Sequence, residues 1–181
     1  KTEGLQWHRW VDPIDEFARD AGGESPRWCV LCTYDCDPTT LQTKVLPVLS
    51  RRGREFRTSI LVDAGAWQRR LATSSALKAR ANIHPVRLDE SIGIFHPKLA
   101  FIRAGHRARV CVGSANITAG GMGSNLELWA SAEDSWLVSA AVDFLHEMVK
   151  LPGLDPAAKR AIRDACLGFE PVASRDFWTS L

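Results

Sequence analysis

The stretch IFHPKLAFIRAGHRARVCVGSANIT, residues 94–118, contains the most informative pattern in this chain. The tract 92–102 is rich in aliphatic and aromatic residues, which is typical of a buried strand. Ala104-Gly105 is a plausible turn, and the segment 108–113 is apolar enough to return as a second strand. The stretch therefore predicts an antiparallel hairpin, with residue 96 and residue 114 at its open end.

Four polar side chains gather at this open end. Side chains alternate along a strand, so His96 and Lys98 share one face, and the returning strand brings Ser114 and Asn116 beside them. An imidazole can act as a nucleophile or a proton carrier, and an ammonium can hold the non-bridging oxygens of a phosphate. A hydroxyl and an amide add neutral donors. This combination predicts phosphodiester chemistry.

These motif residues resemble the phospholipase D superfamily, whose signature is a His-x-Lys pair, an Asp five residues after the Lys, and a Gly-Ser-x-Asn turn. The segments IFHPKLAFI and VCVGSANITAGGMGSNLELW are especially similar to the phospholipase D-like domains of bacterial nucleases, restriction enzymes and helicase-associated modules. Upstream, LCTYDCDP and TSILVDAGAW resemble two earlier core strands of such domains. The resemblance covers roughly Arg27 to Trp136.

The sequence departs from this signature at one position. Five residues after Lys98 stands Arg103, where the family usually has Asp. In the predicted hairpin Arg103 lies near the turn, about six residues and on the order of 20 Å from the open end. We therefore expect the missing Asp to reflect a structural difference and not a loss of the chemistry.

The resemblance implies a mechanism that needs no metal and no cofactor. One histidine attacks phosphorus to give a covalent phosphohistidine, a second histidine protonates the leaving oxygen, and water cleaves the intermediate. Matched to the family motif, the catalytic nucleophile is His96, and Lys98 and Asn116 stabilise the oxygens of the transition state. Ser114 helps to shape this oxygen-binding site, and Glu127 is the acid that orients an imidazole. The residues expected to line the bound substrate are Gly113, Thr118 and Asn125.

A mechanism with two histidines needs two copies of the motif, but the chain has 5 histidines and one His-x-Lys pair. A twofold homodimer would supply the second copy, because an isologous contact places residue 96 of one subunit opposite residue 96 of the other. We therefore predict one composite site on the dyad. The alternative is a second motif in another part of a longer polypeptide, since the chain starts at Lys1 without a Met.

The length and the order of the predicted elements indicate one α/β domain. The chain has 181 residues, of which 45% are hydrophobic, enough for one well-packed core. Strands expected at 27–34, 57–63 and 82–88 alternate with helices, which favours parallel pairing. A further strand at 126–130 and an amphipathic helix at 135–150 follow the hairpin. We expect a mixed, largely parallel β-sheet flanked by helices on both faces, as in phospholipase D-like domains.

Within this single domain, residues 1–25 are expected to form an N-terminal arm and helix. Residues 26–132 form the motif-bearing core, and residues 133–181 form the C-terminal helices. No signal peptide, lipidation motif or apolar run of membrane-spanning length is visible, so the cytoplasm is the expected location and no membrane contact is predicted.

The charge of the chain is only mildly basic, at +2 with a pI near 8.4. Any contact with nucleic acid must therefore be local, because a dedicated electrostatic binder carries a much larger imbalance. The candidate patches are Arg51-Arg52-Gly53-Arg54 with Arg57, Arg69-Arg70 with Lys78 and Arg80, and the run from Arg103 to Arg109.

Five cysteines, an odd number, do not make a disulfide framework, and we expect reduced thiols. The spacing Cys29-x-x-Cys32-x-x-x-Cys36 raises the question of zinc. Residues three apart in a strand face opposite sides of a sheet, and no second pair with ligand spacing follows. The sequence therefore predicts no metal site.

The leading hypothesis is a homodimeric nuclease that acts on nucleic acid, DNA in preference to RNA, in restriction or phage defence. A helicase or ATPase is a further partner that fits this hypothesis. One alternative is a hydrolase of phospholipids or small phosphodiesters. Another is a catalytically silent domain that binds nucleic acid or recruits a partner, which Arg103 in place of Asp would favour.

Overall fold

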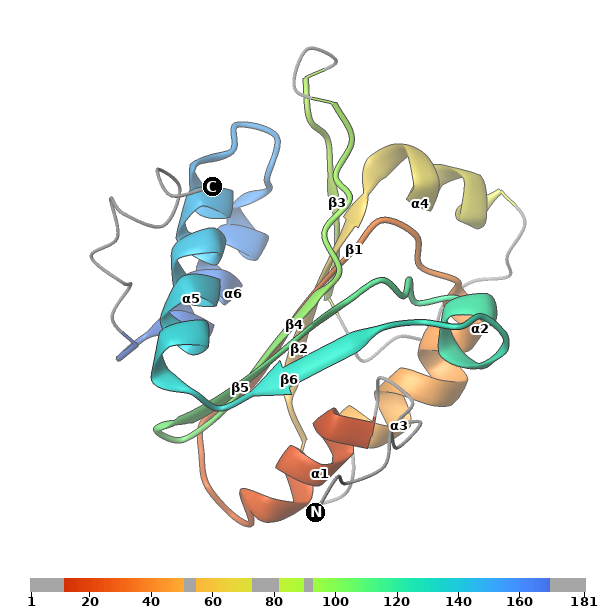
Figure 1. Cartoon of the computed structure of the whole chain (residues 1–181). Helices are drawn as coiled ribbons and strands as arrows, with labels where there is room; N and C mark the ends of the chain where they lie inside the picture. The colour runs from red at the N-terminus through yellow and green to blue at the C-terminus, as the bar shows by residue number, and fades with distance from the viewer. Residues whose placement is uncertain (1–11, 51–54, 73–81, 90–92, 170–181) are drawn as a thin grey trace.

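The centre of the molecule is a six-stranded sheet in the order β3-β2-β1-β4-β5-β6 (Figure 1). The computed structural model describes residues 12–50, 55–72, 82–89 and 93–169. Of the predicted N-terminal arm and helix, residues 1–11 lie outside them. The strands are β1 (Arg27–Thr33), β2 (Arg57–Asp63), β3 (Asn82–Val86), β4 (Leu99–Ala104), β5 (Arg107–Gly113) and β6 (Trp129–Ala132).

The strand directions make the sheet mixed, as predicted. Strands β1, β2 and β3 are parallel neighbours, whereas β4 is antiparallel to β1, β5 to β4, and β6 to β5. Four strands, β1, β2, β3 and β5, therefore run one way, and β4 and β6 run the other. The first three strands thus end at the same edge at which β5 ends and β4 begins.

Helices cover both faces of the sheet, which confirms the predicted layers (Figure 1). One face is covered by α5 (Ser135–Lys150) and α6 (Pro156–Cys166). The other face carries α1 (Asp12–Asp20), α4 (Ala64–Leu71), and a continuous helical stretch between β1 and β2. That stretch consists of α2 (Pro38–Thr40), the π-helical turn η1 (Leu41–Val45) and α3 (Leu46–Leu49).

Burial on both faces explains the continuous apolar runs of the central strands. In β1, Cys29 and Leu31 face the layer of α1 and α3, and Val30 and Cys32 face the layer of α5 and α6. Cys29 and Cys32 therefore point to opposite sides of the sheet, as their spacing predicted. Burial raises the pKa of Cys32 to about 12, which keeps it a thiol.

Two strands differ from their predicted bounds near the motif residues. Strand β4 begins at Leu99, so His96 and Lys98 lie in the segment that leads into it. Pro97 has no N–H to donate to a ladder, which disfavours pairing at this point. Strand β6 begins at Trp129, after Glu127, because the apolar side chains that suggested an earlier start, Leu126 and Leu128, are 81% and 80% exposed.

Between β2 and β3, where the alternation predicts a helix, the structure describes α4, and residues 73–81 lie outside the described residues. The amphipathic helix predicted at 135–150 is present as α5. Ala141, Leu145 and Met148 are buried against the sheet, together with Val138 and Val142.

Asp155 joins α6 to the sheet. Its Oδ1 accepts hydrogen bonds from the N–H groups of Ala157 (2.8 Å) and Ala158 (2.9 Å), which caps the helix. Its Oδ2 lies 2.8 Å from Nδ1 of His84, a buried residue of β3. Burial opposes the charged form, but the hydrogen bonds from Ala158 and His84 outweigh it and lower the pKa of Asp155.

Replacing Asp155 with Ala should lower the free energy of unfolding at neutral pH by about 1 kcal/mol, the usual effect of a lost N-cap. The folded-state pKa of Asp155 is lowered, so its stabilisation is present at neutral pH and disappears as the pH falls through that pKa. Urea unfolding of wild type and Asp155→Ala should therefore give a difference that shrinks in acid. The exposed Asp164, on the same helix, provides the control variant Asp164→Ala.

Candidate active site

The predicted hairpin is present, and its register brings the motif residues together. Leu99 pairs with Val112 at the open end, and Ala104 pairs with Arg107 beside the turn. Gly105 closes that turn with φ of +57°, a left-handed conformation that favours glycine. Beyond the last pair, the Gly113 N–H donates to the Lys98 carbonyl at 3.2 Å, so Ser114 follows directly next to Lys98.

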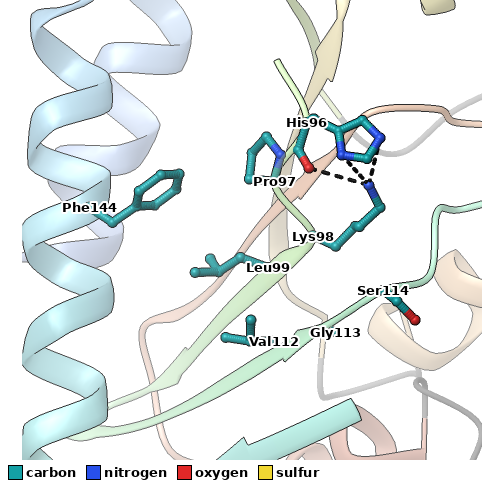
Figure 2. A pocket seen from close by; sticks show the side chains of 8 residues that line it. All are labelled: His96, Pro97, Lys98, Leu99, Val112, Gly113, Ser114 and Phe144. Carbon is teal, nitrogen blue, oxygen red and sulfur yellow. Dashed lines mark hydrogen bonds between the residues drawn. The ribbon is translucent and has the colours of Figure 1, made fainter. Parts of the chain in front are cut away.

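His96 and Lys98 are in direct contact, as Figure 2 shows. The Lys98 Nζ lies 2.9 Å from His96 Nδ1 and 3.1 Å from His96 Nε2. Burial lowers the pKa of Lys98, and the nearby carboxylate of Glu127 acts in the opposite direction. Which ring nitrogen of His96 carries the proton depends on the tautomer, and the other, unprotonated nitrogen is the one that nucleophilic attack requires.

The ends of β1 and β2 hold the His96 segment in place. The ring of Tyr34, the residue after β1, lies 4.8 Å from the His96 ring, measured between centroids. Asp63 ends β2, and its Oδ2 accepts from the N–H of the buried Phe95 at 3.3 Å while its Oδ1 caps α4. The sequence patterns did not single out either residue, although each is a polar residue at the carboxyl end of a predicted parallel strand, a usual position for functional residues.

Glu127 is brought to Ser114. The Ser114 hydroxyl donates to Glu127 Oε2 and accepts from the Leu128 N–H at 3.1 Å. The Asn125 amide donates to Glu127 Oε1 at 3.4 Å. Within one chain the carboxylate thus bonds to Ser114 and Asn125, while His96 bonds to Lys98. The role of Glu127 in orienting an imidazole therefore stays a prediction.

Gly113 is needed for packing as well as for the site. A Cβ at this position would lie 2.4 Å from the Trp129 ring and 2.6 Å from the Leu128 carbonyl oxygen. Only glycine lets β6 approach this closely, and this approach sets the position of the segment that carries Glu127.

The Asn116 side chain is oriented by the loop after β1. Its Oδ1 accepts from the Asp35 N–H at 3.3 Å, which assigns the oxygen end of the amide. No described residue accepts from the Asn116 Nδ2, so this group is available as a donor. Thr118 has a different environment, because its hydroxyl accepts from the Gly121 N–H at 3.2 Å within the loop.

A cavity of about 530 Å³ opens beside these residues. His96, Lys98, Gly113 and Ser114 line its polar side, whereas Asn116, Thr118, Asn125 and Glu127 lie outside its lining. The opposite wall is apolar and includes Phe144, which reaches toward the opening from α5 (Figure 2). Pro97, Leu99 and Val112 complete the lining.

Arg103 lies at the far end of the hairpin, as predicted. It donates to the carbonyl oxygens of Gly105 (2.8 Å), Asp164 (3.1 Å) and Ala165 (3.3 Å), and its guanidinium lies over the ring of Phe169. The residue at the usual Asp position therefore ties the hairpin turn to the end of α6.

Two further geometric observations concern the described residues as a whole. They contain no group of three or more His, Cys, Asp or Glu side chains arranged to hold a metal ion. None of the described helices combines the length and the apolar character that crossing a membrane would require.

Comparisons with known proteins support the fold. The sequence matches no family model and no curated protein at a significant level. The structure is similar to that of NucT from Helicobacter pylori, a nuclease of the phospholipase D family, with a TM-score of 0.54, 16% identity, and coverage of 80% of this chain and 91% of NucT. A mutant of yeast tyrosyl-DNA phosphodiesterase has a TM-score of 0.48 and 10% identity, over 83% of this chain and 38% of that chain. The similarity to NucT shows that the two proteins share a fold.

Replacing Arg103 with Ala should destabilise the protein by about 1–3 kcal/mol, because three carbonyl groups lose a charged donor. Urea unfolding measures this change. The activity per folded molecule should stay unchanged, because Arg103 is distant from His96 along the hairpin. A stable Arg103→Ala variant with impaired turnover would contradict this structural role.

Proposed function

We propose that the protein is a metal-independent phosphodiesterase that cleaves nucleic acid, DNA in preference to RNA, through a covalent phosphohistidine at a homodimer interface. The observation that carries the proposal is the contact of His96 with Lys98 beside Ser114, in a fold shared with the nuclease NucT. Restriction or phage defence in the cytoplasm, with a helicase or ATPase partner, is the setting that the motif segments suggest.

In the proposed reaction an unprotonated ring nitrogen of His96 attacks phosphorus. A P–N bond forms and the P–O bond to the leaving group breaks, while the second subunit's copy of the same histidine gives its proton to the departing oxygen. Water then attacks phosphorus, its proton passes to that second imidazole, and the P–N bond breaks. Both imidazoles return to their starting states, and no oxidant, metal or cofactor is consumed.

The neighbouring residues stabilise the charge on the phosphoryl oxygens. Lys98 supplies a positive point charge beside the nucleophile, and the Asn116 Nδ2 supplies a neutral donor. Ser114 and Asn125 hold the Glu127 carboxylate by hydrogen bonds. Held in this way, the carboxylate can orient an imidazole once the dimer has formed. Gly113 and Thr118 complete the proposed substrate-facing turn.

The edge of the sheet next to the site supports a dimer. Strand β6 is an outer strand, and apolar side chains are exposed beside it. Leu126 and Leu128 flank Glu127, and Val112 of β5 is 41% exposed. Apolar side chains gathered at an open edge are typical of an interface. Contact between two copies here would bring both sites toward one dyad.

The apolar wall of the cavity supports a second candidate, a hydrolase of phospholipids or other apolar phosphodiesters. Leu99, Val112 and Phe144 would fit an acyl chain or an aromatic ring. The role of Arg103 between the turn and α6 removes the main argument for a catalytically silent domain. Parallel assays on DNA and on phosphatidylcholine vesicles distinguish the two enzymes.

Wild-type protein in EDTA should cleave DNA, and His96→Ala should reduce the rate by at least about a thousandfold, because the nucleophile is lost. Gel analysis of single- and double-stranded substrates measures this. The control is His106→Ala, which removes an exposed imidazole at the far turn of the hairpin. Strict dependence on a divalent metal would refute the mechanism, and turnover of vesicles without DNA cleavage would select the lipid-cleaving alternative.

The activity should also fall in alkaline solution, because the Lys98 ammonium loses its proton there. Since the pKa of Lys98 is lowered, this fall should begin at a lower pH than the ordinary lysine pKa of about 10.4. In Lys98→Arg the guanidinium keeps its charge, so the alkaline limb of kcat/KM should move to higher pH. The pH profile on a single-stranded oligonucleotide measures both effects. If the alkaline limbs of kcat/KM coincide in wild type and Lys98→Arg, Lys98 is not the titrating group.

Sedimentation equilibrium should show a dimer in wild type and a monomer in Leu126→Glu/Leu128→Glu, since a buried unpaired charge opposes association. The exposed Leu167, at the C-terminal end of α6, gives the control Leu167→Glu. When wild type and His96→Ala are mixed and allowed to exchange subunits, activity should fall with the square of the wild-type fraction. A proportional fall would mean that each subunit acts alone.

A further inference from the structure

The two arginines in the last turn of α4 have different partners. Arg70 forms a two-point ion pair with Asp35: its Nε lies 2.8 Å from Oδ1, and its Nη2 contacts Oδ2. Hydrogen bonding to this carboxylate raises the pKa of Arg70. The charge of Arg70 is therefore neutralised within the protein, and its role is to fasten α4 to the loop after β1.

Arg69 is bound to a neutral group instead. It is exposed, and its Nη2 donates to the Tyr34 hydroxyl at 3.0 Å. A phenol fixes the guanidinium without cancelling its charge. Within the described part of the chain, no carboxylate pairs with Arg69. Its positive charge is thus held in a defined place and is available to an anion.

Tyr34 connects this charge to the proposed nucleophile. Its ring lies 4.8 Å from the His96 ring, and its hydroxyl, at the other end of the side chain, holds Arg69. The guanidinium and the imidazole are therefore about one tyrosine side chain apart on the same edge of the sheet. A nucleic-acid strand carries one phosphate per about 3.4 Å of axis, so a phosphate one or two nucleotides from the scissile one reaches this distance.

We infer that Arg69, held by Tyr34, binds a phosphate that flanks the scissile phosphate, so that the substrate is a polynucleotide strand. This inference rests on the proposed function and deepens it. Arg69 is the substrate-binding residue, and Tyr34 is a positioning residue that acts through it. A phospholipid with one phosphodiester has no second anion for Arg69, so the feature also argues for a strand over the lipid alternative.

The test compares a short single-stranded oligonucleotide with bis(4-nitrophenyl) phosphate, which has no flanking phosphate, both in EDTA. In Arg69→Gln the ratio of kcat/KM for the oligonucleotide to that for the small substrate should fall by about tenfold, mostly through KM. Arg69→Lys, which keeps the charge, should restore much of the ratio. The control Arg163→Gln changes an exposed arginine of α6 and should leave the ratio at the wild-type value.

Tyr34→Phe separates the two roles of the tyrosine. It keeps the ring against His96 but removes the hydroxyl that holds Arg69, so KM for the oligonucleotide should rise less than in Arg69→Gln, with kcat retained. A drop in kcat on both substrates would instead mean that Tyr34 only supports His96, which would overturn its assigned role.

Binding gives a readout that does not depend on cleavage. Fluorescence anisotropy of the same labelled oligonucleotide should show a salt slope smaller by about one in Arg69→Gln, as expected for one lost phosphate contact. An unchanged slope together with an unchanged substrate ratio would overturn the inference. A reduced slope in a protein that cleaves neither substrate would overturn the nuclease proposal and retain Arg69 as a strand-binding residue.

Discussion

The hydrogen bond from the Gly113 N–H to the Lys98 carbonyl at the open end of the β4–β5 hairpin is the constraint on which the site depends. It continues the strand register past the last pair and fixes Ser114 beside Lys98. The absence of a side chain at Gly113 also lets Trp129 and Leu128 approach, which places Glu127 against Ser114. A slip of one residue would turn these side chains to the other face of the sheet.

The arginines of the β4–β5 hairpin have partners within the fold. Arg107 and Arg109 both pair with Glu133, at 2.8 Å and 2.7 Å, and Arg103 is bound by carbonyl groups at the hairpin turn. In the described part of the predicted basic patches, most of the guanidinium groups thus hold the fold together. Lys98 and Arg69 instead lie at the edge of the sheet where His96 lies.

The sequence was sufficient to predict the mixed sheet, the two helical layers and the hairpin, because each depends on local apolar patterns and on a short turn. It also predicted the contact between His96 and Lys98, but it placed both residues within a strand, whereas strand β4 begins only at Leu99. The bonds between Ser114 and Glu127 and the supports from Tyr34 and Asp63 were not predictable in this way. They depend on how strands far apart in sequence meet at one edge, which periodicity does not encode.

The central claim is that two copies of His96 act on one phosphorus atom. A crystal structure of the protein with orthovanadate, which adopts the geometry of the phosphoryl transition state, tests this claim most directly. If two copies of His96 act together, one vanadate should lie on a twofold axis, bonded to the His96 ring of one subunit, with the partner subunit's His96 on the opposite side and Lys98 on its oxygens. Vanadate bound in a lone subunit, or His96 rings far apart with no anion between them, would contradict it.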